Sequence, residues 1–234
     1  MLLTAGVLLS WCTGQLICLL LQRWVSEATM DENFLRFTIS TLTFQGAALL
    51  LITRFLQWHQ MRWRDLLLGR EQPLWKIIAT GLGVGLLVVP LTLAMGQIST
   101  ELIRAVQLPA DEQMAVKVIE KAVEPAKRVW FMLAAVVLVP VAEETLFRGI
   151  MYPFLKEHIG IWAAVAITST LFAAIHVNVV IFIPLVFLAF VLTWLYERTD
   201  SLLTPILTHA VFNGTNLIML LYPPDFSRWF HGRA

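Results

Sequence analysis

The chain has 234 residues, of which 58% are hydrophobic and only 14% charged, and its mean hydropathy is +0.74. A soluble domain of this composition would lack a polar surface, so the composition excludes an ordinary water-soluble protein and indicates a membrane protein. The net charge of +1, without any basic stripe, excludes nucleic acid as a partner, because binding it requires clustered cations that neutralise phosphates.

Residues 1–22 carry no charged side chain and predict a first transmembrane helix. They lack the basic start and the small-residue cleavage site of a signal peptide, so we expect this helix to be retained. Cys12 and Cys18 would point to different faces of it and could not form a disulfide with each other.

The next two predicted spans are residues 37–53 and 77–97. The second of them contains Gly81, Gly83 and Gly85, which would allow a neighbouring helix to approach closely in lipid. In residues 99–128 apolar and charged side chains alternate, and this pattern predicts an amphipathic helix lying at the membrane surface.

A fourth span is predicted at residues 129–156. No Asp, Glu, Lys or Arg then occurs between Glu157 and Glu197, and one helix of that length would measure about 60 Å, twice the hydrocarbon thickness. The chain must therefore fold back, and we place the break at residues 176–178, between spans 160–175 and 179–196. The seventh span, residues 201–221, has Pro205 in its first turn, where a missing N–H costs little.

These elements predict an all-α, polytopic membrane bundle of about seven transmembrane helices plus an interfacial amphipathic helix. Residues 1–234 form one domain, since no repeat or linker interrupts them. Basic residues cluster after the second span and acidic residues after the first, so the positive-inside tendency places the second loop and the N-terminus in the cytoplasm.

Three ionisable residues lie inside the fourth span, where each ionised group costs about 3 kcal/mol. Glu144 and Arg148 are four residues apart, on one helical face, and can form an ion pair. Glu143 lies about 100° around the helix from Glu144 and needs a partner from another span.

The other spans supply candidate partners at a similar depth. His176 ends the fifth span, and His209 and Asn213 lie one turn apart in the seventh. Pro140, which lacks an N–H, predicts a kink that admits water beside Glu143. Peptide hydrolysis needs a base for that water, an acid for the leaving amine and donors for the oxyanion. Glu143 with His176 could fill the first two roles, and His209 with Asn213 the third.

Three motifs emerge in order: Glu143-Glu144-x-x-x-Arg148, Phe172-x-x-x-His176 and His209-x-x-x-Asn213. They resemble the motifs of the CPBP family, the CAAX protease and bacteriocin-processing intramembrane peptidases related to the type II CAAX prenyl endopeptidase. The resemblance covers about residues 129–221, the motif-bearing peptidase core, and three ordered motifs are far more specific than one.

The resemblance implies an intramembrane endopeptidase in which Glu143 and His176 activate water while His209 and Asn213 stabilise the oxyanion. The remaining motif residues, Glu144, Arg148 and Phe172, would support them. The substrate would be a membrane-associated protein or peptide, with prenylated and otherwise lipidic chains among the candidates. The chain would reside among the lipids of a prokaryotic plasma (inner) membrane.

Other interpretations remain open. No cofactor is required, but Glu143, His176 and His209 also form a feasible zinc set, and without an HExxH motif the sequence does not decide. A non-catalytic scaffold or bacteriocin-immunity-type protein could use the same fold. Buried Glu and His residues also occur in transporters and proton paths. The oligomeric state is not encoded in any pattern that we recognise.

Overall fold

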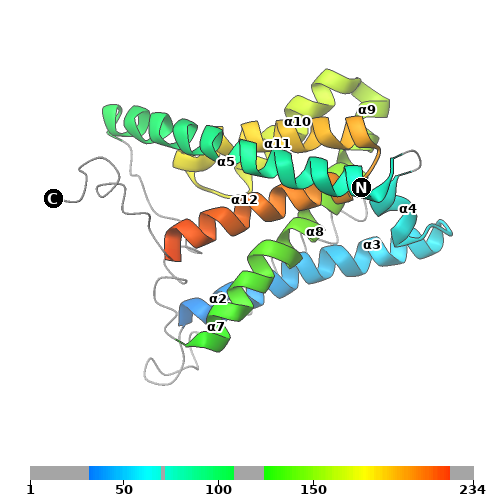
Figure 1. The fold of residues 1–234 in the computed structure, drawn as a ribbon, viewed down its shortest axis with the longest axis horizontal. Coiled ribbons are helices and arrows are strands. Elements are labelled where there is room, and N and C mark those ends of the chain that lie inside the picture. Colours follow the sequence, from blue (N-terminus) through cyan, green and yellow to red (C-terminus); the bar gives the residue numbers. More distant parts are fainter. Residues whose placement is uncertain (1–31, 70–71, 108–123, 222–234) are drawn as a thin grey trace.

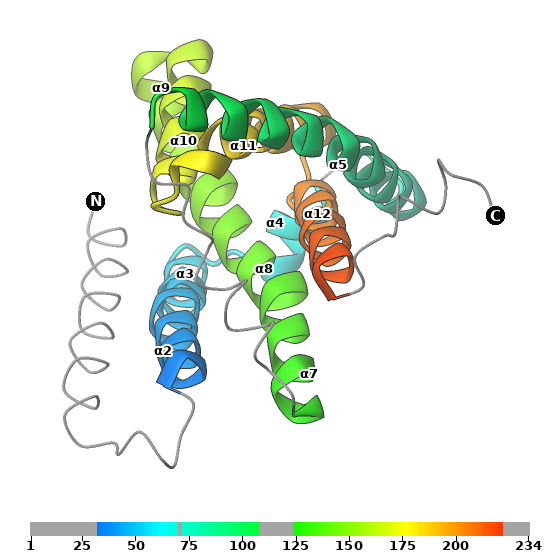
Figure 2. The ribbon, with the colours of Figure 1, turned by 90° about the vertical axis from the view of Figure 1, so that its left-hand side faces the viewer.

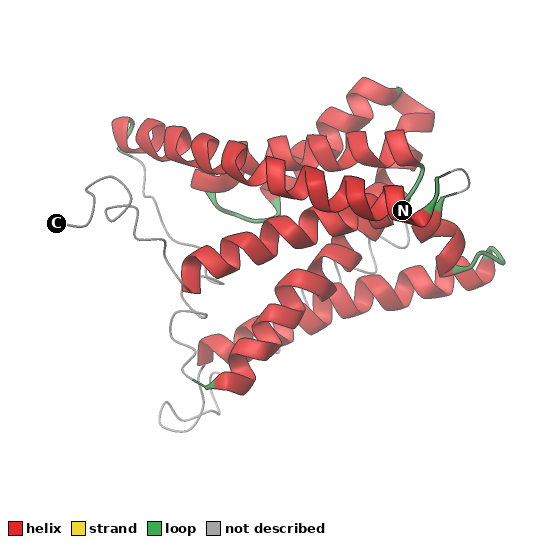
Figure 3. Cartoon of the chain, in the orientation of Figure 1, coloured by secondary structure: helices red, strands yellow, loops and turns green. Residues whose placement is uncertain are grey.

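The computed structural model describes residues 32–69, 72–107 and 124–221, and within these ranges the chain forms helices joined by short turns, without a strand (Figures 1 and 3). The elements, with η marking π-helical segments, are α2 (Glu32–Thr41), η1 (Leu42–Gly46), α3 (Ala47–Trp58), α4 (Trp63–Leu68), α5 (Leu74–Ala105), α7 (Pro125–Leu133), η2 (Ala134–Leu138), α8 (Val139–Glu144), η3 (Thr145–Met151), α9 (Tyr152–Ile159), α10 (Ile161–Ala174), α11 (Val179–Thr199) and α12 (Leu203–Leu221). The predicted all-α class is confirmed. The predicted first span, with Cys12 and Cys18, lies outside the described residues.

Several described helices are long and apolar enough to cross a membrane. There are four of them: Phe37–Trp58, Leu74–Ala105, Pro125–Ile159 and Val179–Thr199. Each contains one of the predicted spans. The predicted fifth span forms α10, whose 14 residues fall short of the roughly 20 that a full crossing needs. The predicted seventh span forms α12, with 19 residues. The chain is therefore a polytopic integral membrane protein.

The third span extends further than the sequence predicted. Residues 99–105, assigned to an amphipathic surface helix, instead continue α5. Thr100 Oγ1 donates to the Gly96 carbonyl at 2.8 Å, and Arg104 pairs with Glu101 at 2.9 Å on the exposed surface. These local contacts let the helix carry polar side chains beyond its apolar part. Residues 108–123 of the predicted amphipathic interval lie outside the described residues.

α5 packs most extensively against α12, and glycine makes this contact possible. A Cβ atom at Gly81 would lie 2.8 Å from Leu207 Cβ. One at Gly85 would lie 2.7 Å from Val211 Cβ. Thr208 Oγ1 donates to the Gly81 carbonyl at 2.9 Å. The backbones thus approach as closely as small residues permit in lipid, and this contact fixes the position of α12.

The helix Pro125–Ile159 is irregular at its centre. It contains the π-helical segments η2 and η3, and Glu143 and Glu144 end the short α8 between them. The sequence predicted a kink at Pro140; in the structure the π-helical η2 ends at Leu138, two residues before it. Such segments are frequent at functional sites, because the extra residue in the turn disturbs the backbone hydrogen bonds.

The motif-bearing helices lie together in the middle of the molecule. Figures 1 and 2 show α8 and α12 between α5, α10 and α11 on one side and α2 and α3 on the other. The predicted break at residues 176–178 is confirmed: α10 ends at Ala174 and α11 begins at Val179. Asn178 caps α11, since its Oδ1 accepts the N–H groups of Val180 and Ile181.

Candidate active site

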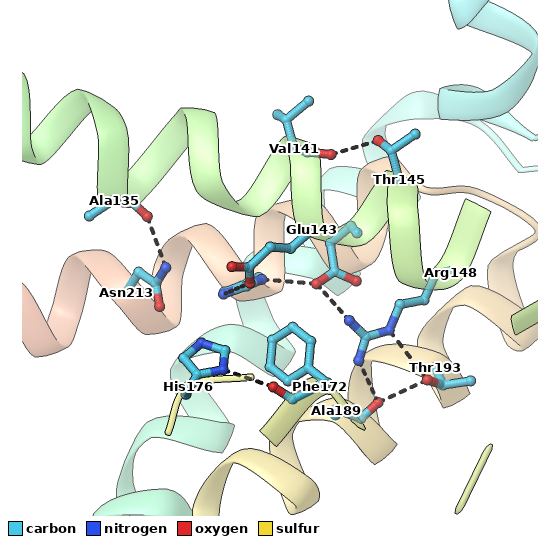
Figure 4. Close-up of polar contacts among 12 residues, drawn as sticks. Ala135, Val141, Glu143, Thr145, Arg148, Phe172, His176, Ala189, Thr193 and Asn213 are labelled. Carbon is cyan, nitrogen blue, oxygen red and sulfur yellow. Dashed lines mark hydrogen bonds and ion pairs between the residues drawn. The ribbon is translucent and has the colours of Figure 1, made fainter. Parts of the chain in front are cut away.

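A buried ion pair occupies the centre of the site (Figure 4). Arg148 Nη1 lies 2.9 Å from Glu144 Oε1, as the spacing of four residues predicted, and the side chains are 1% and 0% exposed. Arg148 also donates from Nη2 to the Ala189 carbonyl at 2.9 Å and from Nε to Thr193 Oγ1 at 3.3 Å. A buried pair is stable only when its other donors are satisfied, and α11 satisfies them here.

His209 lies between the two glutamates. Its Nδ1 is 2.9 Å from Glu144 Oε1, and its Nε2 is 4.0 Å from Glu143 Oε2. Arg148 holds Glu144 as a carboxylate, which can only accept, so Nδ1 carries the proton and donates. In the neutral ring, Nε2 then directs its lone pair towards Glu143. The sequence predicted the two residues of the ion pair, but not that Glu144 would orient an imidazole.

Glu143 is held differently from its neighbour. It is 5% exposed, and its Oε2 has no hydrogen-bond partner among the described residues. The 4.0 Å to His209 Nε2 is longer than a direct hydrogen bond. The site therefore contains a buried carboxyl group with an oxygen that no donor in residues 32–69, 72–107 and 124–221 engages.

His176 lies beside the same aromatic ring as His209. The centroid of the Phe172 ring is 5.1 Å from that of His176 and 5.8 Å from that of His209. His176 Nδ1 donates to the Phe172 carbonyl at 2.8 Å, which leaves Nε2 as an acceptor in the neutral ring. Within the described structure no hydrogen bond joins His176 to Glu143. Phe172 thus contacts both imidazoles. The imidazole contact of Glu143 within 4.0 Å is with His209.

Asn213 lies one turn beyond His209 on α12 and points to the helix that carries the glutamates (Figure 4). Its Nδ2 donates to the Ala135 carbonyl, in η2, at 2.8 Å. A carboxamide has two N–H donors, so this bond orients the amide and leaves the second N–H available.

The zinc alternative concerns three of these residues. Across residues 32–69, 72–107 and 124–221, no group of three His, Cys, Asp or Glu side chains is arranged to hold a metal ion.

Two groups that support the site were missed by the sequence analysis. The Ala189 carbonyl is a main-chain atom, for which a sequence carries no signal. Thr193 had a weak signal, because it is the one hydroxyl in the apolar stretch 179–195. Only the packing of α11 against Arg148 makes either of them part of the site.

The fold and the site define a polytopic membrane protein with a buried centre of two carboxyl groups and the imidazole of His209. The half-buried imidazole of His176 lies in the turn that follows α10. Residues 125–215, which include every motif residue, match the family described as "Type II CAAX prenyl endopeptidase Rce1-like". Over this segment the chain is similar to the CPBP family of CAAX protease-like proteins.

Two curated relatives, both from Bacillus subtilis (strain 168), share part of the sequence. "Uncharacterized protein YpbD" is 36% identical over 81 residues, which cover 33% of this chain and 39% of the relative. "Putative membrane peptidase YdiL" is 31% identical over 84 residues, which cover 36% of this chain and 34% of the relative. The chain thus matches less than half the length of either relative. No solved structure matches it.

Proposed function

We propose that this chain is an intramembrane endopeptidase that hydrolyses a peptide bond of a membrane-associated protein or peptide. The observation that carries the proposal is the Glu143 carboxyl group, buried inside a membrane helix, with Oε2 unpartnered among the described residues and facing His209. An acid so placed is expensive in lipid and is retained for chemistry or transport. The family of residues 125–215 favours hydrolysis.

In the proposed mechanism Glu143 accepts a proton from water, and the resulting hydroxide attacks the carbonyl carbon of the peptide bond. His176 assists at Nε2, the nitrogen that its bond to Phe172 leaves free. When the C–N bond breaks, the proton taken from water passes to the leaving amine. The negative charge that develops on the carbonyl oxygen is stabilised by the second N–H of Asn213 and by His209, which donates from Nε2 when its ring carries two protons.

Glu144 and Arg148 act in this proposal through His209. The carboxylate of Glu144 accepts from Nδ1 and fixes which nitrogen of the ring faces Glu143. Arg148 in turn fixes the carboxylate and is itself anchored on α11. The proposal routes no step through a metal ion, and metal analysis of the purified protein tests the zinc alternative.

The test is proteolysis by the purified protein, in detergent or liposomes, of a library of internally quenched peptides with and without a C-terminal prenyl group. Glu143→Gln keeps the size of the side chain but removes the base, and we expect kcat to fall by about 10²- to 10⁴-fold. Glu101→Gln is the matched control, because Glu101 lies on the exposed surface of α5 with its side chain 73% accessible.

Other outcomes would overturn the proposal. Unchanged proteolysis in Glu143→Gln would remove Glu143 from the chemistry. If the native chain cleaves no peptide but its deletion still changes the phenotype of the cell, the scaffold is favoured. Ion flux across liposomes that contain the protein would favour a transporter.

We also propose a plasma-membrane location with the loop of Arg62 and Arg64 in the cytoplasm. Labelling of a cysteine in that loop from outside intact cells would contradict this orientation.

A further inference from the structure

Gln45 is a buried polar residue in an apolar crossing, and it lies outside the segment that matches the family. It is 8% exposed, and its Oε1 has no hydrogen-bond partner among the described residues. It is the one buried residue of the π-helical η1. An unmatched buried acceptor costs about 1–3 kcal/mol, and polar residues and π-helical segments in membrane helices both tend to mark functional positions.

The helix that carries Gln45 runs parallel to the helix that carries Glu143. The Phe37 and Phe131 rings contact each other with centroids 4.4 Å apart. Further along both helices η1 packs against α8, and beyond that α3 packs against η3. The contacts advance in the same direction along the two chains, so the order of residues can be used to compare heights.

This comparison places Gln45 close to the level of the proposed base. Gln45 is eight residues beyond Phe37, and Glu143 is twelve residues beyond Phe131. At 1.5 Å per residue the two differ in height by about 6 Å, little more than one helical turn. Gln45 is the buried residue of η1, and η1 is the element that packs against α8.

The fully buried side-chain atoms on these two elements that have no partner among the described residues are all acceptors. They are Gln45 Oε1, Glu143 Oε2 and Glu144 Oε2. Acceptors need donors, and a peptide substrate brings one backbone N–H per residue other than proline. Water activation uses the Glu143 oxygen, and Glu144 already holds His209. The Gln45 oxygen has no role in that chemistry and remains available for the substrate.

We propose that Gln45 is a substrate-binding residue whose Oε1 accepts a backbone N–H of the peptide next to the bond that is cleaved. The inference rests on the proposed peptidase function. A carboxamide suits this role because it presents one acceptor and two donors without adding a charge to the membrane.

The test combines a change in the protein with a change in the peptide. Gln45→Met keeps the length of the side chain and removes the amide, and we expect KM for the best-cleaved library peptide to rise about tenfold, with a smaller change in kcat. A set of peptides, each N-methylated at one position near the cleaved bond, removes one N–H at a time. At the contacted position, N-methylation should cost the native chain about tenfold in kcat/KM and the variant almost nothing.

Controls separate this inference from the function on which it rests. Gln57→Met changes the same residue type on the exposed surface of α3 and should leave KM unchanged. Two results would overturn the role of Gln45: an equal loss of kcat/KM on N-methylation in the native chain and in Gln45→Met, or an unchanged KM in Gln45→Met. The Glu143→Gln variant would still test the peptidase function separately. Activity retained in Glu143→Gln would overturn the proposed mechanism. The N-methylated peptides would then still test whether Gln45 binds the substrate.

Discussion

α12 is held in place by two contacts of opposite character. On one side it meets α5 across Gly81 and Gly85, where backbones touch and the shared hydrogen bond runs from Thr208 to a main-chain carbonyl. On the other side His209 meets the buried ion pair of Glu144 and Arg148. The first contact depends on shape, and the second on charge and hydrogen bonding.

The difference shows that separate contacts can fix the position of a helix and the orientation of one of its side chains. Close packing does not orient hydrogen-bonding atoms. The glycine contact therefore sets where α12 lies, but not which nitrogen of His209 faces Glu143. A chain of charged hydrogen bonds is directional and sets the ring. Substitutions in the two contacts should therefore have separable effects on stability and on activity.

The largest effect on stability is expected from Arg148→Met. It leaves Glu144 as a buried carboxylate without its cation, which costs about 3–5 kcal/mol. Unfolding of the detergent-solubilised protein, followed by helical circular dichroism, measures the loss. Adding Glu144→Gln should recover part of the stability, because the second change removes the unpaired charge, but it should not restore proteolysis. A single Arg148→Met variant as stable as the native chain would contradict the role of the ion pair.

A smaller loss of stability is expected at the glycine contact. Gly85→Ala places a Cβ atom 2.7 Å from Val211 Cβ, so α12 must shift. Overpacking of this kind costs about 1–3 kcal/mol, measured by the same unfolding transition. Gly83→Ala is the matched control: nothing lies within 4 Å of its added Cβ. It should be neutral or stabilising, and equal losses at both positions would show that helix propensity, rather than contact with α12, governs the result.

The smallest effect is expected from Thr193→Val. It removes the hydroxyl that accepts from Arg148 Nε at 3.3 Å while keeping the shape of the side chain. We expect a loss of about 1 kcal/mol. Thr53→Val is the control, since its hydroxyl donates to the Leu49 carbonyl in its own helix. In the Arg148→Met background, Thr193→Val should lose most of its effect, and an additive result would show that the two residues do not act together.

Much of the site was predictable because its residues are costly in lipid. Glu143, Glu144 and Arg148 stand out in a helix where charges are rare, and the spacing of four residues predicted the ion pair that forms. His209 and Asn213 were predicted to share a face, and both point to the helix of the glutamates. The amphipathic assignment of residues 99–105 was wrong, because α5 satisfies its polar side chains locally and continues.

The sequence by itself determined that the chain is a membrane protein, where most of its helices run and which polar residues need partners, because hydropathy and helical periodicity are local properties. Only the tertiary structure decided that His209 contacts both glutamates, that α11 anchors Arg148 and that Gln45 lies near the level of Glu143. Such pairings depend on how separate helices pack, and the local sequence around each residue carries no signal of that packing.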